Sequence, residues 1–412
     1  MTLEQFHALR SERGHELLAR LAREALSGDD LLPVLKRYRA EYPTELVSAA
    51  IDLTRLREKG KTKFSRAAEM YFTSDGLQMA SSEPVARHTA GRFAGLPQVL
   101  DLCCGIGADT LALAEASRCV VAVDRDPLAL EIARANARAL GMEGCSHFVH
   151  ADVVEFAIRA PLLLGAPAAI FIDPSRREAR AAARRPEAYA PPVSWCLGLL
   201  QLAPRVAIKV SPALDYEQAL AQTAAEVEII SLHGECKEAM CWLGEFRTCA
   251  RRATLLPSGD TLTEEGPSSD ALGEIGAWIY EPDPAVIRAG LLRRLAGELD
   301  LRRIDAEIAY LSGDRDISSP FVTGYQVQEV IPWGLKRLNE ALALRHISQV
   351  TIKKRGFPLT PEDLQKKLKL AGKKQGESAT LICTHARGKP VVIIANTGVV
   401  SETQRHRGTE DE

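Results

Sequence analysis

The first part of the chain repeats apolar residues at helical spacing among charged ones. Leu17, Leu18 and Leu21 form one such set, and a second follows at 31–35. Apolar positions three and four residues apart lie on one face of a helix. The pattern therefore predicts a helical region over residues 1–65, packed on the next part of the chain because no Gly-rich linker separates the two.

Short apolar runs divided by helical stretches begin at about residue 97. The runs are 99–103, 119–123, 148–149, 168–172, 206–210 and 227–232. Buried strands of a parallel sheet read as nearly continuous apolar runs, and such strands alternate with helices. The pattern predicts an α/β fold in which helices cover both faces of a parallel sheet.

Beyond Tyr280 the pattern changes again. Helical patterns at 285–299, 330–344 and 361–370 precede apolar strands at 378–383 and 390–394, and a polar tail comes last. This predicts a separate small α+β domain. The stretch 257–270, rich in Pro, Gly and Ser, predicts a long loop ahead of it.

Composition excludes several classes of protein. The chain has 412 residues, 46% of them hydrophobic and 26% charged, with a formal net charge of −2. We expect a globular protein of two or three domains. No run reaches the ~20 apolar residues that cross a bilayer, and the start has no apolar core behind a basic leader, so we expect neither a membrane nor a secreted protein. Nine cysteines, never spaced CxxC, favour reduced thiols in the cytoplasm.

The most informative segment is a glycine turn between a strand and a helix. The strand ends at Asp101 to Cys103, Gly105 and Gly107 allow a tight turn, and a helix opens at Thr110. A dinucleotide fingerprint would need glycine where Thr110 stands. Asp-x-x-x-Gly-x-Gly instead resembles motif I of class I S-adenosylmethionine-dependent methyltransferases. The resemblance implies that S-adenosylmethionine is the cofactor and that Asp101, Cys103, Gly105 and Gly107 shape its methionine site.

Two further acids follow the next two strands. Asp124 comes nineteen residues after Gly105, where a carboxylate can accept two hydrogen bonds from a ribose diol. Asp152 resembles the acid that contacts the adenine amine in the same family. Each acid alone could be a solvated turn residue, but their order behind the glycine turn favours cofactor binding.

The acceptor side is predicted after the fourth strand, at Asp173 and Pro174. Asp-Pro at this point resembles the Asp/Asn-Pro-Pro-aromatic motif of amino methyltransferases, whose acid and proline carbonyl accept hydrogen bonds from an exocyclic amine. Here Ser175 replaces the second proline and Arg176 replaces the aromatic residue. The alternative is an ordinary Asp-Pro turn.

The segment 77–88 carries a second resemblance, to the stretch ahead of motif I in trimethylguanosine synthases, which methylate the exocyclic amine of guanine. Ser82, Glu83 and His88 are its counterparts, in a changed order. On the alternative reading, Glu83-Pro84 simply begins a helix.

Two clusters allow more than one interpretation. Arg176 and Arg177 open a group of five arginines within residues 176–185, which either contacts phosphates or forms a solvated helix face. His233, Cys236 and Cys241, with Cys249, have spacings that fit no common zinc knuckle. We therefore expect buried thiols and no metal there.

The segment 345–374 holds nine Lys and Arg against two acids. Such a local excess is an electrostatic footprint for nucleic acid, with Lys353, Lys354 and Arg355 as candidates, or else a solubilising face. Residues 280–290 and 355–370 resemble the C-terminal part of a bacterial methyltransferase family whose tail is described as ferredoxin-like and then THUMP-like. The THUMP-like part implies RNA binding.

Together these patterns predict a class I, Rossmann-like α/β methyltransferase with a basic RNA-binding module. The expected domains are a helical region 1–65, a methyltransferase domain 66–280, a ferredoxin-like segment 281–323, a THUMP-like domain 324–398 and a polar tail 399–412. The expected reaction methylates RNA, either tRNA or rRNA, on a base amine, with guanine favoured. The alternatives are a protein or small-molecule methyltransferase, and a non-catalytic RNA-binding protein that retains the fold.

Overall fold

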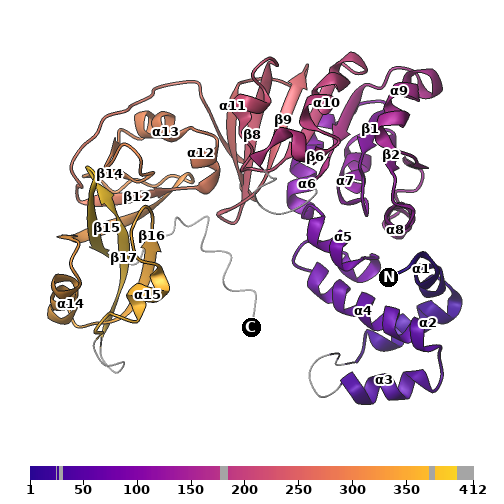
Figure 1. Ribbon diagram of the computed structural model, residues 1–412, viewed down its shortest axis with the longest axis horizontal. Coiled ribbons are helices and arrows are strands. Elements are labelled where there is room, and N and C mark those ends of the chain that lie inside the picture. The colour runs from indigo at the N-terminus through magenta and orange to yellow at the C-terminus, as the bar shows by residue number, and fades with distance from the viewer. Residues whose placement is uncertain (25, 27–30, 177–183, 371–375, 397–412) are drawn as a thin grey trace. The chain divides into compact units, whose positions relative to one another are not determined.

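A computed structural model describes residues 1–24, 26, 31–176, 184–370 and 376–396. The chain forms two compact units (Figure 1). Unit 1 comprises Met1–Glu226 and Ala239–Thr248, and unit 2 comprises Val227–Glu238 and Cys249–Glu412. The chain thus leaves unit 1, returns for one short stretch and leaves again. The predicted polar tail lies outside the described residues.

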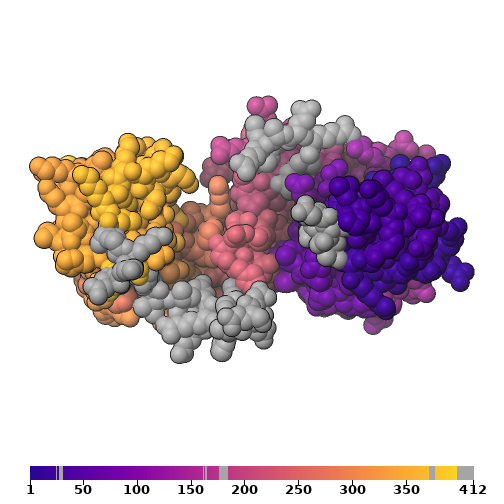
Figure 2. Space-filling model, turned by 90° about the horizontal axis from the view of Figure 1, so that it is seen from below, coloured from indigo at the N-terminus to yellow at the C-terminus, as the bar shows by residue number. Residues whose placement is uncertain are grey.

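Unit 1 begins with the expected helices, the first of which Figure 2 shows in indigo. Thr2 caps the first of them through a capping box with Gln5, and Ser11 caps the second. Phe6, Leu17 and Leu53 are fully buried in their shared core. The helices of this part are α1 (Leu3–Leu9), α2 (Glu12–Leu21), α3 (Leu31–Arg39), α4 (Thr44–Gly60), η2 (Ala67–Glu69), α5 (Ser74–Met79), α6 (Glu83–Ala90) and η3 (Gly91–Phe93).

A sheet forms the centre of unit 1, with its strands in the order β9-β7-β4-β1-β2-β3. The strands are β1 (Val99–Leu102), β2 (Val120–Asp124), β3 (Ser146–His150), β4 (Ala169–Ile172), β7 (Arg205–Val210) and β9 (Glu235–Gly244). The pairings from β7 through β3 are parallel, as the apolar runs predicted. Strand β9 differs from this parallel arrangement, because it runs antiparallel to β7.

Helices and a small hairpin connect these strands. Asp126 caps α8, whose first residue is Pro127, and Asp152 caps α9. The connecting elements are α7 (Ala108–Ala116), α8 (Pro127–Ala139), α9 (Val153–Leu164), β5 (Ser175–Arg176), η5 (Pro186–Ala188), β6 (Tyr189–Ala190), α10 (Val193–Leu197), η6 (Gly198–Gln201) and α11 (Tyr216–Ala219).

One buried side chain fastens three parts of unit 1. Asn136 of α8 accepts a hydrogen bond from the Tyr71 amide at 2.7 Å and donates to the carbonyls of Tyr71 at 3.2 Å and Ile106 at 3.1 Å. Ile106 stands between the two glycines of the turn after β1. The segment that comes after the N-terminal helices, the glycine turn and α8 are thus held by the same amide group.

Unit 2 contains two groups of strands. In the first, β8 (Ala225–Leu232) pairs in parallel with β10 (Arg251–Leu256), which pairs antiparallel with β11 (Asp260–Thr263). The second is a sheet in the order β13-β14-β12-β15-β18-β17-β16. Its strands are β12 (Trp278–Pro282), β13 (Arg302–Arg303), β14 (Leu311–Gly313), β15 (Val322–Pro332), β16 (Ile347–Lys354), β17 (Glu377–Ala386) and β18 (Lys389–Ala395). Its helices are α12 (Pro284–Arg288), α13 (Leu292–Glu298), α14 (Leu335–Leu344) and α15 (Pro361–Gln365).

The α+β character expected beyond Tyr280 is present, with two local corrections. The stretch 257–270 is not only a loop, because Gly259, with φ of +80°, lets the chain turn back so that β11 pairs with β10. The helical pattern at 285–299 forms two helices, since Gly290 has φ of +74° and interrupts the helical backbone.

Three findings concern the cysteines, the helices and the side chains that could bind metal. All nine cysteines belong to the described residues and are free thiols. Within the described ranges, every helix is too short or too polar to span a bilayer. Likewise, His, Cys, Asp and Glu side chains of the described residues form no group of three or more arranged to hold a metal ion.

Candidate cofactor and acceptor site

Four aspartates follow four neighbouring parallel strands of unit 1. Asp173 follows β4, Asp101 lies in β1 near its end, Asp124 ends β2 and Asp152 follows β3. Because these strands stand in the order β4-β1-β2-β3, the four acids lie along the carboxyl edge of one sheet in the order 173, 101, 124, 152. This edge is where open α/β sheets bind their ligands.

The turn after β1 is closed on one side and open on the other. Gly107 has φ of +89°, and a Cβ there would stand 2.9 Å from the Cβ of Ala133 in α8, so only glycine allows this packing. Gly105 has φ of +54°, and a Cβ there would meet no atom within 4 Å. The open side at Gly105 gives a ligand direct access to the backbone.

Cys103 also has a left-handed backbone, with φ of 65°. Burial raises the pKa of its thiol, and the neighbouring carboxylates of Asp124 and Asp173 raise it further. Cys103 is therefore a neutral, packed side chain of the turn at physiological pH.

Asp124 ties the end of β2 to the glycine turn. Its Oδ2 accepts a hydrogen bond from the Gly105 amide at 2.8 Å, and its Oδ1 accepts one from the Asp126 amide at 2.9 Å. A carboxylate oxygen can accept more than one hydrogen bond, so both oxygens retain capacity for a diol. Asp152 is exposed and receives its two cap bonds on Oδ1, from the amides of Val154 at 2.8 Å and Glu155 at 3.4 Å.

Asp101 is the most buried acid of the four. Its side chain is fully buried, Thr110 donates to Oδ2 at 2.5 Å, and Oδ1 has no hydrogen-bond partner. Burial raises its pKa to about 8, so the group is mostly protonated at neutral pH. A buried oxygen without a partner, in the strand that leads into the glycine turn, fits a polar ligand group, which is what the methionine end of S-adenosylmethionine would present.

A buried lysine that the sequence patterns did not reveal lies against the predicted acceptor acid. Lys209 of β7 has only 8% of its side chain exposed. Its Nζ stands 2.8 Å from Asp173 Oδ2, 3.1 Å from Asp109 Oδ2 and 2.6 Å from Ser81 Oγ. Ser81 in turn donates to Asp109 Oδ2 at 3.0 Å. The signal in the sequence was a lysine inside the apolar run 206–210, and we define Lys209, Asp173, Asp109 and Ser81 as the lysine cluster.

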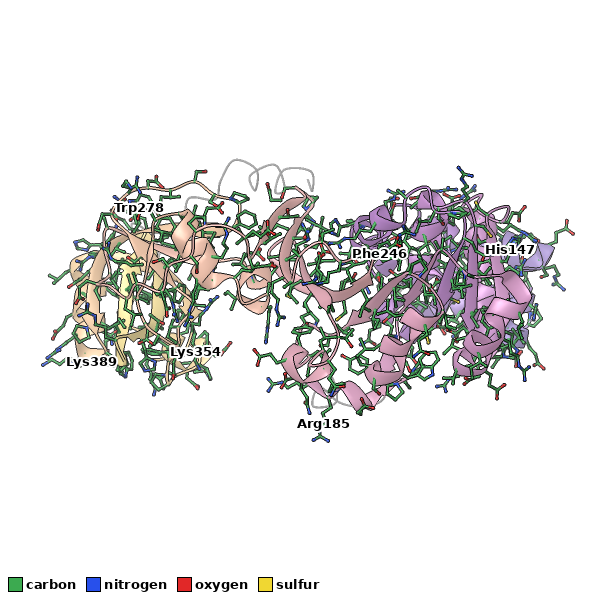
Figure 3. All side chains as sticks on the ribbon, turned by 90° about the horizontal axis from the view of Figure 1, so that it is seen from above. His147, Arg185, Phe246, Trp278, Lys354 and Lys389 are labelled. Atoms are coloured by element: carbon green, nitrogen blue, oxygen red, sulfur yellow. The ribbon has the colours of Figure 1, made fainter. Side chains whose placement is uncertain are left out.

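Pro174 is buried, and the chain then enters the hairpin of β5 and β6, where Arg176 stands opposite Tyr189. Tyr189 is buried and accepts a hydrogen bond from the Ser211 amide at 3.0 Å. Arg177 lies outside the described residues, and the side chain of Arg176 is not described either. Arg185, from the same arginine group, is exposed and points away from the ribbon in Figure 3.

The segment ahead of motif I begins helix α6 at Glu83, as its alternative reading predicts. Glu83 accepts hydrogen bonds from the amide of Ser65 at 2.6 Å and its hydroxyl at 3.0 Å, and pairs with Arg87 at 2.8 Å. Ser82 is the N-cap residue of α6. It is Ser81, one residue earlier, that joins the lysine cluster.

In unit 2, the predicted basic residues at 353–355, at the end of β16, divide into two groups. Lys353 and Arg355 both bind Glu281, at 2.6 Å and 3.3 Å, and Arg355 also stacks on Tyr310. Lys354, labelled in Figure 3, is exposed. Three further lysines, at 366, 367 and 369, are also exposed.

Three family models match the chain. A methyltransferase domain matches residues 99–163, a THUMP domain-like family matches 322–397, and a domain of unknown function, DUF8688, matches 2–60. The methyltransferase match begins with β1 and includes the glycine turn, Asp124 and Asp152.

Relatives resemble nearly the whole chain. Two uncharacterised S-adenosylmethionine-dependent methyltransferases of Mycobacterium tuberculosis, from strains CDC 1551 and H37Rv, are each 33% identical over 336 residues, which is 78% of this chain and 89% of theirs. A solved structure of a protein proposed to be a methyltransferase, from Porphyromonas gingivalis W83, matches with a TM-score of 0.76 at 22% identity, over 93% of this chain and 98% of that one.

Proposed function

The chain belongs to the S-adenosylmethionine-dependent methyltransferases, and on that premise we propose that it methylates RNA on an exocyclic base amine, with guanine favoured. Its cofactor is S-adenosylmethionine, and its fold is the α/β fold of methyltransferases with a THUMP-like C-terminal domain. The observation that carries the proposed acceptor is Asp173, a strand-end carboxylate beside the glycine turn that keeps 33% of its side chain exposed.

On the cofactor side, we assign the methionine end to Asp101, Cys103, Gly105 and Gly107. Asp124 would accept the ribose hydroxyls and Asp152 the adenine amine, in keeping with their order along the sheet edge. When bound, S-adenosylmethionine supplies a methyl group on a sulfonium sulfur. The residues of the chain bind and orient, and need supply no metal for this chemistry.

On the acceptor side, Asp173 and the carbonyl of Pro174 would accept the two hydrogens of a base amine. Those bonds aim the nitrogen lone pair at the methyl group, so that an N–C bond forms as the S–C bond breaks. One amine hydrogen then leaves as a proton to solvent. A base must reach Asp173 from a single strand or by flipping from a helix.

Charge in unit 2 supports RNA as the polymer. Lys354, Lys366, Lys367 and Lys369 are exposed, and no carboxylate of the described residues lies within 4.0 Å of their amines. Cations without an internal partner are available to phosphates. Lys353 and Arg355 remain predicted contacts, but their pairing with Glu281 makes them weaker candidates than Lys354. The roles of Arg176 and Arg177 also remain predictions.

The decisive experiment is transfer of labelled methyl from S-adenosylmethionine into unmodified bacterial total RNA, with nucleosides resolved by mass spectrometry. We expect methylguanosine from the wild type and none from Asp173→Ala, while calorimetry shows that the variant still binds the cofactor. Asp173→Asn, which keeps an acceptor oxygen of the same shape, should retain part of the activity. Absence of label from RNA in the wild type would refute the proposal.

A second experiment tests the RNA surface. The charge-reversed variant Lys366→Glu/Lys369→Glu should bind RNA more weakly, with a salt slope reduced by about 2 because two phosphate contacts are lost. Arg315→Ala, which removes an exposed cation that pairs with Asp300 at 3.0 Å, is the matched control. Equal losses in both variants would argue against a specific surface.

A second candidate function is methylation of protein or a small molecule. It is favoured by Ser175 and Arg176, which stand where the amino methyltransferase motif has proline and an aromatic residue. It predicts label that survives RNase. A binding protein without turnover would instead hold both cofactor and RNA and produce no label. The free thiols of all nine cysteines agree with a cytoplasmic location, which we include in the proposal.

A further inference from the structure

We propose that Lys209 is a positioning residue for methyl transfer, whose ammonium fixes the carboxylate of Asp173 and keeps it charged for hydrogen bonding to the acceptor. The inference rests on the proposed function, in which Asp173 receives the acceptor amine. It adds a residue that lies outside every motif in the sequence.

The sheet itself brings the two side chains together. Strands β4 and β7 pair in parallel, with Ile172 opposite Ile208. Asp173 follows Ile172 directly and Lys209 follows Ile208 directly, so the two residues stand next to the last pair of this ladder. This register brings the two residues together at the end of β4, and Lys209 Nζ stands 2.8 Å from Asp173 Oδ2.

The ammonium group of Lys209 has a partner for each of its hydrogens. An ammonium has three N–H donors, and Lys209 Nζ has Ser81 Oγ, Asp109 Oδ2 and Asp173 Oδ2 within 3.1 Å. These partners come from the segment before α6, from α7 and from the end of β4. Burying an ammonium costs several kcal/mol before such partners offset it, so an apolar residue would be the less costly choice for a position in this strand.

The charges around Asp173 show what the lysine does. Asp109 lies on α7, Asp101 on β1 and Cys103 in the turn, and burial already raises the pKa of Asp101 to about 8. Among the described residues, Lys209 is a cation that contacts both Asp109 and Asp173. Without it, two or three carboxyls would share a poorly solvated site, where like charges favour the protonated form.

A protonated Asp173 would be a poor hydrogen-bond acceptor, and its own hydrogen would point at the substrate amine whose hydrogen it must accept. With Oδ2 bound by Lys209 and 33% of the side chain exposed, the acid keeps one orientation and still reaches the acceptor side. Misplacement of such a group by about 1 Å can cost 100-fold in rate.

The first test compares Lys209→Met with the wild type in the RNA methylation assay. We expect kcat near pH 7 to fall about 100-fold, with the dissociation constant for S-adenosylmethionine changed less than threefold. The acid limb of the pH–rate profile should move up by at least one pH unit, so that part of the activity returns near pH 9. Lys237→Met, which removes an exposed lysine of β9, should change none of these.

A purely structural role would lower the amount of active enzyme equally at every pH, and an unmoved acid limb would therefore overturn the inference. Lys209→Arg keeps the charge and serves if Lys209→Met fails to fold. It should preserve the position of the acid limb even where kcat falls, and an acid limb displaced to the extent expected for methionine would overturn the proposal.

A double-variant comparison needs no substrate. Adding Asp173→Asn to Lys209→Met removes the carboxylate that has lost its partner, so the double variant should unfold at a higher temperature than Lys209→Met alone. If the second substitution gives no such rescue, the pairing does not hold Asp173. If the wild type methylates no RNA, the proposed function fails, and this comparison still decides whether Lys209 controls Asp173.

Discussion

The amide of Asn136 gives the strongest prediction for stability. Asn136→Ala removes three hydrogen bonds to backbone groups, from the Tyr71 amide and to the carbonyls of Tyr71 and Ile106, in a fully buried site. Each buried backbone group left without a partner costs about 1–3 kcal/mol. A water molecule can enter the space left by the amide and recover part of this loss, so we expect a net loss of about 3 kcal/mol.

The measurement is thermal unfolding of the chain, read at the transition of unit 1. For a unit of this size, 1 kcal/mol shifts the melting temperature by about 2–4 °C, so the variant should melt about 6–12 °C lower. Hydrogen exchange should show faster exchange at the Tyr71 amide. Because Ile106 belongs to the glycine turn, cofactor binding should also weaken, by up to about tenfold, or 1.4 kcal/mol.

Asn339→Ala is the matched control, because Asn339 also bonds two backbone groups, of Lys367 and Lys369, but at the surface of unit 2. Water replaces those bonds, so the loss should stay below about 1 kcal/mol. A melting temperature for Asn136→Ala as close to the wild type as that of the control, with the Tyr71 amide still protected, would refute the reasoning.

Three further variants test other parts of the structure. Asp124→Ala should raise the dissociation constant for S-adenosylmethionine at least tenfold in calorimetry. Asp126→Ala removes only the cap of α8, so it should cost about 1 kcal/mol of stability and change that dissociation constant less than twofold. Equal effects of the two variants on cofactor binding would contradict the assignment of Asp124 to the ribose. Burial raises the pKa of Asp101 from an ordinary 3.8 to about 8, so the folded chain holds a proton that the unfolded chain releases, and wild-type stability falls as pH rises through this window. The side chain in Asp101→Asn does not titrate. The unfolding free energy of this variant, relative to that of the wild type, should therefore rise by up to about 1.4 kcal/mol per pH unit between pH 4 and 8. If the unfolding free energies of both proteins change with pH in the same way, Asp101 is not neutral in the folded chain. Glu281→Ala leaves two half-buried cations without their shared partner and should destabilise unit 2 by about 1–3 kcal/mol in denaturant titrations, while an unchanged midpoint would mean that solvent already screens those pairs.

The elements that the sequence predicts well are those fixed by short-range patterns. The apolar runs mark β1, β2 and β4 within a residue or two, because strands buried on both faces are almost continuously apolar. The glycine turn is equally local, since its backbone requires positive φ at Gly105 and Gly107. Asp124 is found by the same logic of strand ends.

Other features depend on which distant segments meet. In the sequence, Lys209 only interrupts an apolar run. Its role becomes visible when β4 and β7 pair and place it near Asp173, and when Ser81 and Asp109 contact the same ammonium group. The residues of β9 likewise do not indicate that it pairs antiparallel to β7. Lys353 counted as a free cation in the sequence, because nothing near it in the chain reveals its pairing with Glu281.

The ladder between β12 and β15 bears on how the C-terminal part of this protein can be inherited. Trp278 pairs with Gln326 and Pro282 with Val322, so strands from before the THUMP-like match stand in one sheet with strands inside it. The core joins Ile279 and Tyr310 to Ile382 and Ile393 in the same way. A gene fusion that carried residues 322–397 alone would expose one edge of β15 and half of that core. Recombination should therefore transfer residues 278–396 together. A search for this domain in other proteins should use that longer segment.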